Sequence, residues 1–398
     1  MSISFMRYKI TFFYFVQYLS VGILGPYFAM YLYQKGFNGT QIGLFLGSMP
    51  IAVMLLQPLW SYFSDIFNTR RNLLVISCLG SSVSMIGLGV SSEFSAVLFW
   101  VLLYSGFRAP IQPISNAITL DYLELINRPQ DFGLVRLWGS VAFVVSSILL
   151  GVFFLEKLLT IFSWILLGIY LLLTGISFSL PKRGKKYQYS LFDGLHFLPE
   201  NPEFVLYLIG IAFIGATLSI SISYQTLFLD MMGTPPWLLG LITSLPALFE
   251  IPLMLLISTL FKRVSWSIMI FIGACALPIR WFFYLLITDP VWVIPTQILH
   301  SIAVVSFMVV GVFFIDKSIS EKWRATSQGL YSTAMGGLGS GVGLYLAGYV
   351  LDLYDVRMIW AFNLILGLLG VIFIKLALRK FEEVENSKKA KVDTCQIM

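Results

Sequence analysis

The chain has few charged residues, few cysteines and few histidines. Of its 398 residues, 12% are charged, three are cysteine and two are histidine. A soluble domain carries about 25% charged residues, so this composition excludes an ordinary soluble protein. Cys78, Cys275 and Cys395 are scattered and odd in number, which supports neither a disulfide framework nor a metal site. We therefore expect no metal and no cofactor.

Apolar side chains are abundant instead, at 58% of the residues, with a mean hydropathy of +0.85. A helix needs about 20 mostly apolar residues to cross the roughly 30 Å hydrocarbon core of a membrane. The sequence therefore predicts an all-α membrane protein of twelve transmembrane helices without a separate soluble domain. The runs bounded by charges, proline or glycine clusters are about 10-33, 41-63, 72-91, 95-120, 133-155, 159-180, 204-229, 237-261, 266-287, 291-315, 325-351 and 357-378.

Lysine and arginine are distributed unequally between the two sets of connections. Short cytoplasmic loops collect basic residues, so we expect both termini in the cytoplasm of a multi-pass protein of a cell membrane, a bacterial inner membrane. These loops also account for the net charge of +6, so no nucleic acid is expected as a partner. We expect the protein to be a monomer. The rich side holds Arg7, Lys9, Arg70, Arg71, Arg128, Lys182, Arg183, Lys185, Lys186, Lys262, Arg263, Lys317, Lys322, Arg324, Arg379 and Lys380, and the poor side Lys35, Lys157 and Arg357.

The longest polar interval, from Pro181 to Phe204, divides the chain into halves of six helices each. "IGLFLGSMP" in the second helix corresponds to "LGLITSLP" in the eighth, and the fifth and eleventh helices are both rich in small residues. Such correspondences at an offset of six helices favour a duplicated architecture. The predicted units are an N-terminal bundle over 1-180, a cytoplasmic linker over 181-203, a C-terminal bundle over 204-380 and a polar cytoplasmic tail over 381-398.

Four ionisable side chains lie at membrane depth: Arg108, Glu250, Arg280 and His300. Each costs roughly 3 kcal/mol there and is usually retained because it faces a partner or a water-filled cavity. Glu250 is the one carboxyl group placed well inside a predicted membrane helix, which favours it as a proton carrier coupled to Arg280 and His300. A buried ion pair between Glu250 and Arg280 that only fixes helix packing is the alternative.

Substrate recognition is predicted from the remaining polar groups at mid-helix depth. Arg108 suits an anionic substrate, or it neutralises backbone carbonyls exposed around Pro110 and Pro113. Neutral side chains that face a cavity would hydrogen-bond a small solute. These candidates are Gln17, Tyr18, Gln112, Asn116, Gln225 and Asn363.

Several stretches resemble the major facilitator superfamily. "SYFSDIFNTRR", from Ser61 to Arg71, is similar to that family's Gly-x-x-x-Asp-x-x-Gly-x-Arg-Arg/Lys loop between helices two and three. The resemblance implies that Asp65, Arg70 and Arg71 gate the cytoplasmic side. "DFGLVRLWGSVAF", "LPIRWF" and "QILH" resemble the branch that contains phenylpropionate permeases and, more distantly, lactose permease. Arg280 and His300 match that relative's ninth-helix arginine and tenth-helix histidine.

This resemblance implies two six-helix bundles that rock about a substrate held between them. It implies a secondary active transporter, with proton-coupled symport of a small aromatic carboxylate favoured, and the lack of a Gly-Pro motif in the fifth helix agrees with symport. A sugar or nucleoside symporter remains open, and so does a membrane receptor that transports nothing. An enzyme is not expected, because His196 and His300 do not supply a nucleophile-base or metal constellation.

Overall fold

We describe the protein from a computed structural model that places residues 3–67, 70–128, 131–154, 157–181, 198–199, 201–260, 263–319 and 323–397. Every regular element in these ranges is a helix. The α-helices are α1 (Ile3–Gln34), α2 (Gly39–Phe67), α3 (Arg70–Val90), α4 (Phe94–Arg108), α5 (Ile111–Leu125), α6 (Phe132–Leu149), α7 (Leu158–Ser177), α8 (Pro202–Met231), α9 (Pro236–Leu260), α10 (Trp266–Leu286), α11 (Val293–Val305), α12 (Gly311–Ser318), α13 (Arg324–Thr333), α14 (Ser340–Leu353) and α15 (Met358–Ile397).

Twelve helical spans in the described ranges are long and apolar enough to cross a membrane, which confirms the predicted class. Some spans contain two or more of these elements. The fourth span, Phe94–Leu125, is longer than the predicted 95-120, and it divides into α4 and α5 at Ala109 and Pro110. Proline lacks an N–H group and disfavours helical geometry in the residue before it, which explains the division.

Short π-helical segments interrupt three of the other spans. They lie at Leu150–Phe154, Ser306–Val310 and Ala334–Gly339, and each continues directly into or from an α-helix. A further 3-10 turn, Pro290–Trp292, opens the tenth span. These segments are places where the helical pitch changes without a loop.

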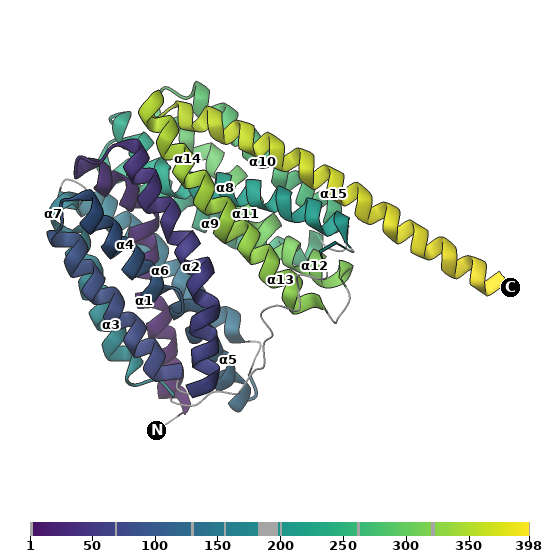
Figure 1. The fold of residues 1–398 in the computed structure, drawn as a ribbon, viewed down its shortest axis with the longest axis horizontal. Coiled ribbons are helices and arrows are strands. Elements are labelled where there is room, and N and C mark those ends of the chain that lie inside the picture. The colour runs from purple at the N-terminus through teal and green to yellow at the C-terminus, as the bar shows by residue number, and fades with distance from the viewer. Residues whose placement is uncertain are drawn as a thin grey trace.

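The helices form two bundles, which lie at the left and right of Figure 1. In the first bundle α1 packs on α6, and α3 packs on α4 and α7; in the second, α15 packs on α8 and α10, and α10 packs on α11. Helix α15 continues well beyond its bundle to the C-terminus (Figure 1). Most of the predicted linker over 181-203 lies outside the described residues, so the proposed domain boundaries stay a prediction.

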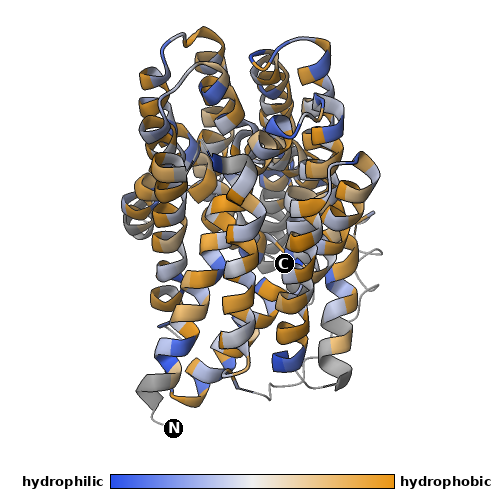
Figure 2. Cartoon of the chain, turned by 90° about the vertical axis from the view of Figure 1, so that its left-hand side faces the viewer, coloured by the Kyte–Doolittle hydropathy of each residue, from blue (hydrophilic) through white to orange (hydrophobic). Residues whose placement is uncertain are grey.

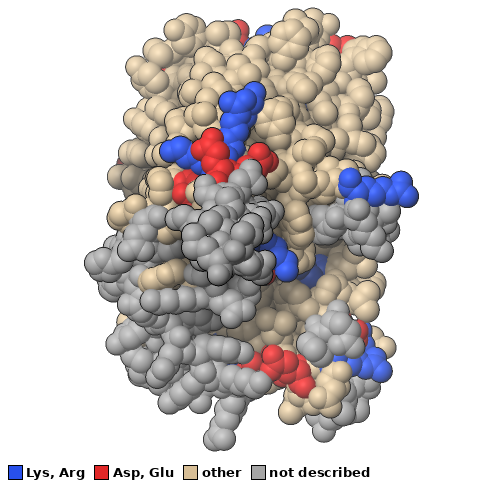
Figure 3. All heavy atoms as spheres, turned by 90° about the vertical axis from the view of Figure 1, so that its right-hand side faces the viewer, with Lys and Arg blue, Asp and Glu red and all other residues tan. Residues whose placement is uncertain are grey.

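The outer surface is largely apolar. Hydrophobic residues predominate along the helices in Figure 2, and hydrophilic ones gather mainly at the helix ends. Figure 3 shows one face from the side, where uncharged surface separates small groups of charged side chains. Large side chains such as Leu55, Phe153 and Leu286 are exposed, as expected for groups that face lipid.

The two bundles meet along a seam of glycines between α2 and α14, which lie side by side in Figure 1. A Cβ atom added to Gly348 would lie 2.2 Å from the carbonyl oxygen of Gly39 and 2.6 Å from the Cα of Gly43. One added to Gly47 would lie 2.4 Å from the carbonyl oxygen of Gly341. The helix backbones therefore touch directly, which only small residues allow.

Other contacts between the bundles lie near the same end. Asp352 of α14 accepts hydrogen bonds from the backbone N–H groups of Gly39 and Thr40, the latter at 2.6 Å. Thr226 of α8 donates to the carbonyl oxygen of Pro26 in α1. Since the carboxylate of Asp352 lies at the N-terminus of α2, it also interacts favourably with the helix dipole. This end, opposite to the N-terminus of the chain, is held closed.

Candidate functional site

A cluster of neutral polar groups occupies the first bundle. Gln17 of α1 donates to Gln112 of α5 at 2.7 Å, and Gln112 donates to Asn116 at 2.8 Å. The hydroxyl of Tyr14 donates to Asn116 at 2.7 Å, and the hydroxyl of Ser115 donates to Gln17 at 3.3 Å. The structure thus brings together three of the predicted substrate-binding residues, Gln17, Gln112 and Asn116.

Arg108 and Tyr18 lie beside this cluster. Arg108, at the C-terminal end of α4, interacts electrostatically with the hydroxyl groups of Tyr104, Tyr170 and Tyr18. The ring of Tyr18 packs against the backbone of α6, where a Cβ atom on Gly139 would lie 2.7 Å from it. Both side chains are only partly buried. The first bundle therefore presents the guanidinium group of Arg108 next to a set of amides and hydroxyls.

Arg280 is the centre of a second cluster, in the C-terminal bundle. Its side chain is fully buried, at 0% exposure. Its guanidinium group donates to five side chains that are contributed by α8, α10 and α11. The acceptors are Ser221 at 3.0 Å, His300 Nδ1 at 2.7 Å, Gln225 at 2.7 Å, Tyr284 at 2.9 Å and Gln297 at 2.8 Å.

The charge on Arg280 has no carboxylate beside it among the residues that the structure describes. Each hydrogen-bond acceptor in the cluster is neutral, and the Nε–H group of Arg280 has no acceptor. Arginine can only donate, so His300 accepts through Nδ1 and carries its proton on Nε2. A buried cation without a counter-charge is costly, and the site is therefore suited to an anion that enters from outside the chain.

Aromatic rings form one wall of this cluster. The guanidinium carbon of Arg280 lies 4.6 Å from the ring centroid of Trp281 and 5.1 Å from that of Tyr284. Trp360 of α15 stacks on Trp281 at 5.3 Å and meets Tyr284 edge-on at 4.6 Å. The indole N–H groups of Trp281 and Trp360 are buried without acceptors. Cation-π contacts partly offset the cost of the buried charge.

Glu250 does not belong to the Arg280 cluster. It lies on α9, is partly exposed, and interacts electrostatically with Arg136 of α6 in the other bundle. The alternative of a packing ion pair between Glu250 and Arg280 therefore has no support in this conformation. The reason is architectural, because α9 packs on α6 and α11 whereas α10 packs on α11 and α15.

Two further predicted residues have separate positions. Gln225 belongs to the Arg280 cluster and not to the amide cluster of the first bundle. Asn363 is fully buried on α15 and donates to the carbonyl oxygen of Thr217 at 3.2 Å, while its own Oδ1 has no partner. That bond links α15 to α8, so the structure gives Asn363 a packing contact.

Three members of the Arg280 cluster were not predicted from the sequence: Ser221, Tyr284 and Gln297. Their spacing from predicted residues along the same helices could have indicated them. Ser221 lies four residues before Gln225, Tyr284 four after Arg280, and Gln297 three before His300. Residues three or four apart share a helix face, so each predicted polar residue could have directed attention to its neighbour.

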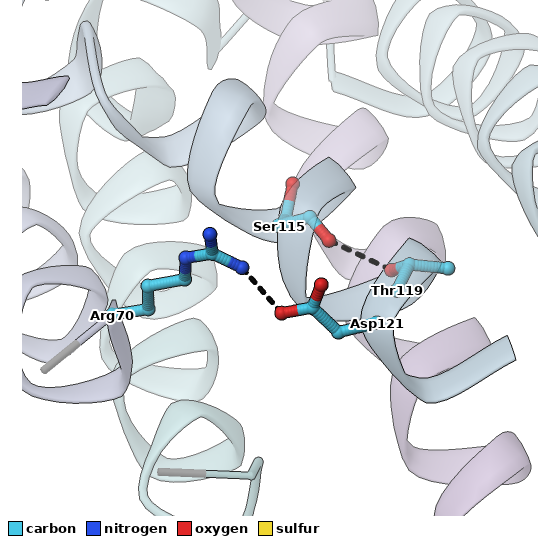
Figure 4. A network of polar contacts seen from close by, with 4 residues as sticks. All are labelled: Arg70, Ser115, Thr119 and Asp121. Carbon is cyan, nitrogen blue, oxygen red and sulfur yellow. Dashed lines mark hydrogen bonds and ion pairs between the residues drawn. The ribbon is translucent and has the colours of Figure 1, made fainter. Parts of the chain in front are cut away.

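The predicted cytoplasmic gate shows one strong contact. Arg70, at the start of α3, is paired with Asp121 of α5, and Figure 4 shows the guanidinium and carboxylate groups pointing toward each other. In the same view Thr119 donates to the carbonyl oxygen of Ser115 at 2.7 Å. Arg71 donates to the carbonyl oxygen of Phe178 at 3.2 Å. The side chain of Asp65 lies outside the described residues.

Comparisons with known proteins agree on a family. The profile of the MFS_1 like family matches residues 7–362. The chain is 26% identical to "Uncharacterized transporter YwbF" of Bacillus subtilis (strain 168), with 94% of this chain and 93% of that protein covered. It is 25% identical to "Probable 3-phenylpropionic acid transporter" of Escherichia coli (strain K12), with coverage of 88% and 93%. The crystal structure of nucleoside transporter NupG superposes with a TM-score of 0.83 at 19% identity, over 96% of this chain and 99% of that one.

Proposed function

The chain belongs to the MFS_1 like family of the major facilitator superfamily, and we propose that it is a proton-coupled symporter of a small aromatic carboxylate. The observation that carries the proposal is Arg280, a fully buried guanidinium group whose acceptors are neutral. A substrate carboxylate would supply the missing negative charge through charge-assisted hydrogen bonds. The rings of Trp281, Tyr284 and Trp360 would contact the aromatic part.

The other predicted residues take roles in the same cycle. Glu250 carries the proton, and Arg280 and His300 tune and relay it, while Arg108 assists recognition from the first bundle together with Gln17, Tyr18, Gln112 and Asn116. Gln225 holds Arg280 in place. Arg280 is inaccessible in this conformation, so the carboxylate reaches it when the bundles move. The similarity to the 3-phenylpropionic acid transporter supports this substrate class.

The orientation of the chain in the membrane is inferred from the positions of the basic residues. Arg7, Arg70 and Arg128 lie at the ends of spans opposite to the glycine seam, which supports an extracellular position for the seam. Both termini are then cytoplasmic in a bacterial inner membrane, with Arg70 and Arg71 at the cytoplasmic gate. In this orientation the seam closes the extracellular side, and alternating access would require the seam to open.

Uptake by purified protein in liposomes tests the proposal. With an inward proton gradient we expect accumulation of 3-phenylpropionate and alkalinisation outside. Glu250→Gln should abolish proton-driven accumulation but retain exchange of labelled for unlabelled substrate, whereas Arg280→Gln should abolish both. Arg357→Gln, which removes a guanidinium group that donates to Leu285 and Ile287 carbonyls, is the control for loss of a positive charge. Proton-driven accumulation that persists in Glu250→Gln removes that residue from the proton path.

A nucleoside or sugar is the second candidate. The amide and hydroxyl cluster of Gln17, Gln112, Asn116 and Tyr14 offers the neutral donors and acceptors that hydroxyl-rich solutes need. The same liposomes should therefore be offered xanthosine, uridine and maltose. Accumulation of one of these, with no response to 3-phenylpropionate, would replace the carboxylate proposal, and no flux of any compound would favour a receptor.

A further inference from the structure

An open pocket of about 860 Å³ lies in the first bundle, apart from both polar clusters. Its walls come from the first turns of α1, the end of α5 and the first turns of α6. Two arginines, Arg7 and Arg128, line its polar side, and Leu125, Leu134, Leu137 and Trp138 line its apolar side. These four apolar side chains are 45% to 81% exposed.

Two of the side chains that line the pocket face away from the proposed substrate site. Successive residues of an α-helix are turned by about 100°, so Tyr8, which lines the pocket, and Gln17 of the amide cluster lie on opposite faces of α1. On α6, Trp138 lines the pocket, whereas Arg136 two residues earlier interacts with Glu250 of the other bundle. Tyr8 and Trp138 therefore lie on helix faces that are turned away from the amide cluster and from Glu250.

The pocket also lies across a membrane boundary. Arg7 is in the first turn of the span that begins at Met6, and Arg128 lies between the spans that end at Leu125 and begin at Phe132. Leu134, Leu137 and Trp138 are inside the latter span. Charged groups thus stand at the level of lipid headgroups, and the apolar wall stands at the level of the acyl chains.

The electrostatics of the polar side favour an anion. The Oδ2 atom of Asp131, whose side chain is 15% exposed, lies 3.2 Å from Nη1 of Arg7 and 3.8 Å from Nη1 of Arg128. These three side chains together carry a net charge of +1. The side chains of Arg7 and Arg128 remain 34% and 61% exposed, so their other N–H groups are accessible. A guanidinium pair fixed by one carboxylate is preorganised to bind the phosphodiester of a lipid.

From this combination we propose that the pocket binds an anionic phospholipid of the inner leaflet, with its phosphate at Arg7 and Arg128 and its acyl chains against Leu134, Leu137 and Trp138. The proposal is independent of the transported substrate. Arg128→Gln is the variant of choice, because the closer pair between Arg7 and Asp131 remains and the protein should fold. Arg263→Gln removes an exposed positive charge from the same set of basic connections and serves as the matched control.

Native mass spectrometry of protein released from mixed phosphatidylglycerol and phosphatidylcholine nanodiscs measures the bound lipid. We expect one retained phosphatidylglycerol in the native chain and in Arg263→Gln, and about tenfold lower occupancy in Arg128→Gln. Equal retention of both lipids, or unchanged phosphatidylglycerol in Arg128→Gln, overturns the proposal. Displacement of the lipid by millimolar inorganic phosphate alone would show a site for soluble anions and would also overturn it.

Fluorescence quenching provides a readout that does not depend on an arginine variant. Bromine on lipid acyl chains quenches the fluorescence of nearby indoles. The contribution of Trp138 is the fluorescence of the native chain minus that of Trp138→Phe. We expect this contribution to fall more in brominated phosphatidylglycerol than in brominated phosphatidylcholine. Equal quenching by the two lipids would mean that Trp138 meets bulk lipid only, and the assigned site would be wrong.

Discussion

The glycine seam between α2 and α14 allows a quantitative test of the closed state. Gly348→Ala would place a Cβ atom 2.2 Å from the carbonyl oxygen of Gly39, a backbone atom that cannot rotate away. Ordinary contact needs more than about 3.4 Å, so the helices must separate by about 1 Å. Overpacking of this kind costs typically 1–3 kcal/mol, which would lower the population of the closed state by about 5- to 150-fold.

Electron-spin distance measurement reports that population directly. With the native cysteines replaced by serine, labels at Glu93 and Trp292 would sit on exposed positions of the two bundles. We expect a short distance in the parent, a shift to longer distances in Gly348→Ala, and at least fivefold slower transport. Gly336→Ala is the control, because a Cβ there meets nothing within 4 Å. If Gly348→Ala behaves like Gly336→Ala in both assays, the close approach of the backbones is refuted.

Three other changes have defined outcomes. Asp352→Asn removes the charge at the N-terminus of α2, and the same labels should show a roughly threefold gain of the open state, whereas no gain would mean that the carboxylate is dispensable. Asp121→Asn removes the carboxylate that pairs with the buried Arg70 and should cost roughly 3 kcal/mol, measured as a lower unfolding midpoint in detergent. The double variant Asp121→Asn, Arg70→Gln should recover part of that loss, and an unchanged midpoint in Asp121→Asn contradicts the prediction. Tyr284→Phe removes hydroxyl contacts to Arg280 and Gln225 and should raise the half-saturating substrate concentration about tenfold without changing the pH profile of uptake.

The fold could be predicted from the sequence because its main determinant is local. Each membrane crossing depends on about 20 consecutive residues, so counting apolar runs gives the number of spans without knowledge of their neighbours. The division of the fourth span at Pro110 could have been found from that proline, but the π-helical turns have no comparable signal. At one of them, Ser306 packs closely on Gly273 of another span, where a Cβ would lie 2.2 Å from its side chain, and no local pattern indicates that contact.

The candidate site was harder to predict because its contacts join distant helices. Arg280 and His300 were both found as ionisable groups at membrane depth, and the structure joins them by a hydrogen bond of 2.7 Å. A pairing of Glu250 with Arg280 was conceivable only because their helices follow each other in the chain. Likewise, the partner of Arg70 is 51 residues away on α5, and the choice of partner depends on the packed bundle.

The π-helical turn Ser306–Val310 gives the tenth span a natural place to change shape. Gln297 and His300 precede it in α11, and α12 follows it. The hydrogen bonds of a π turn span one residue more than those of an α turn. Conversion of this π turn to an α turn would therefore shift the helix register by one residue and rotate α12 by about 100° while α11 kept its orientation. Backbone amides of Ser306–Val310 should then exchange with solvent deuterium faster than those on either side. The π turn would act as a hinge about which α12 rotates while α11, with Gln297 and His300, stays in place.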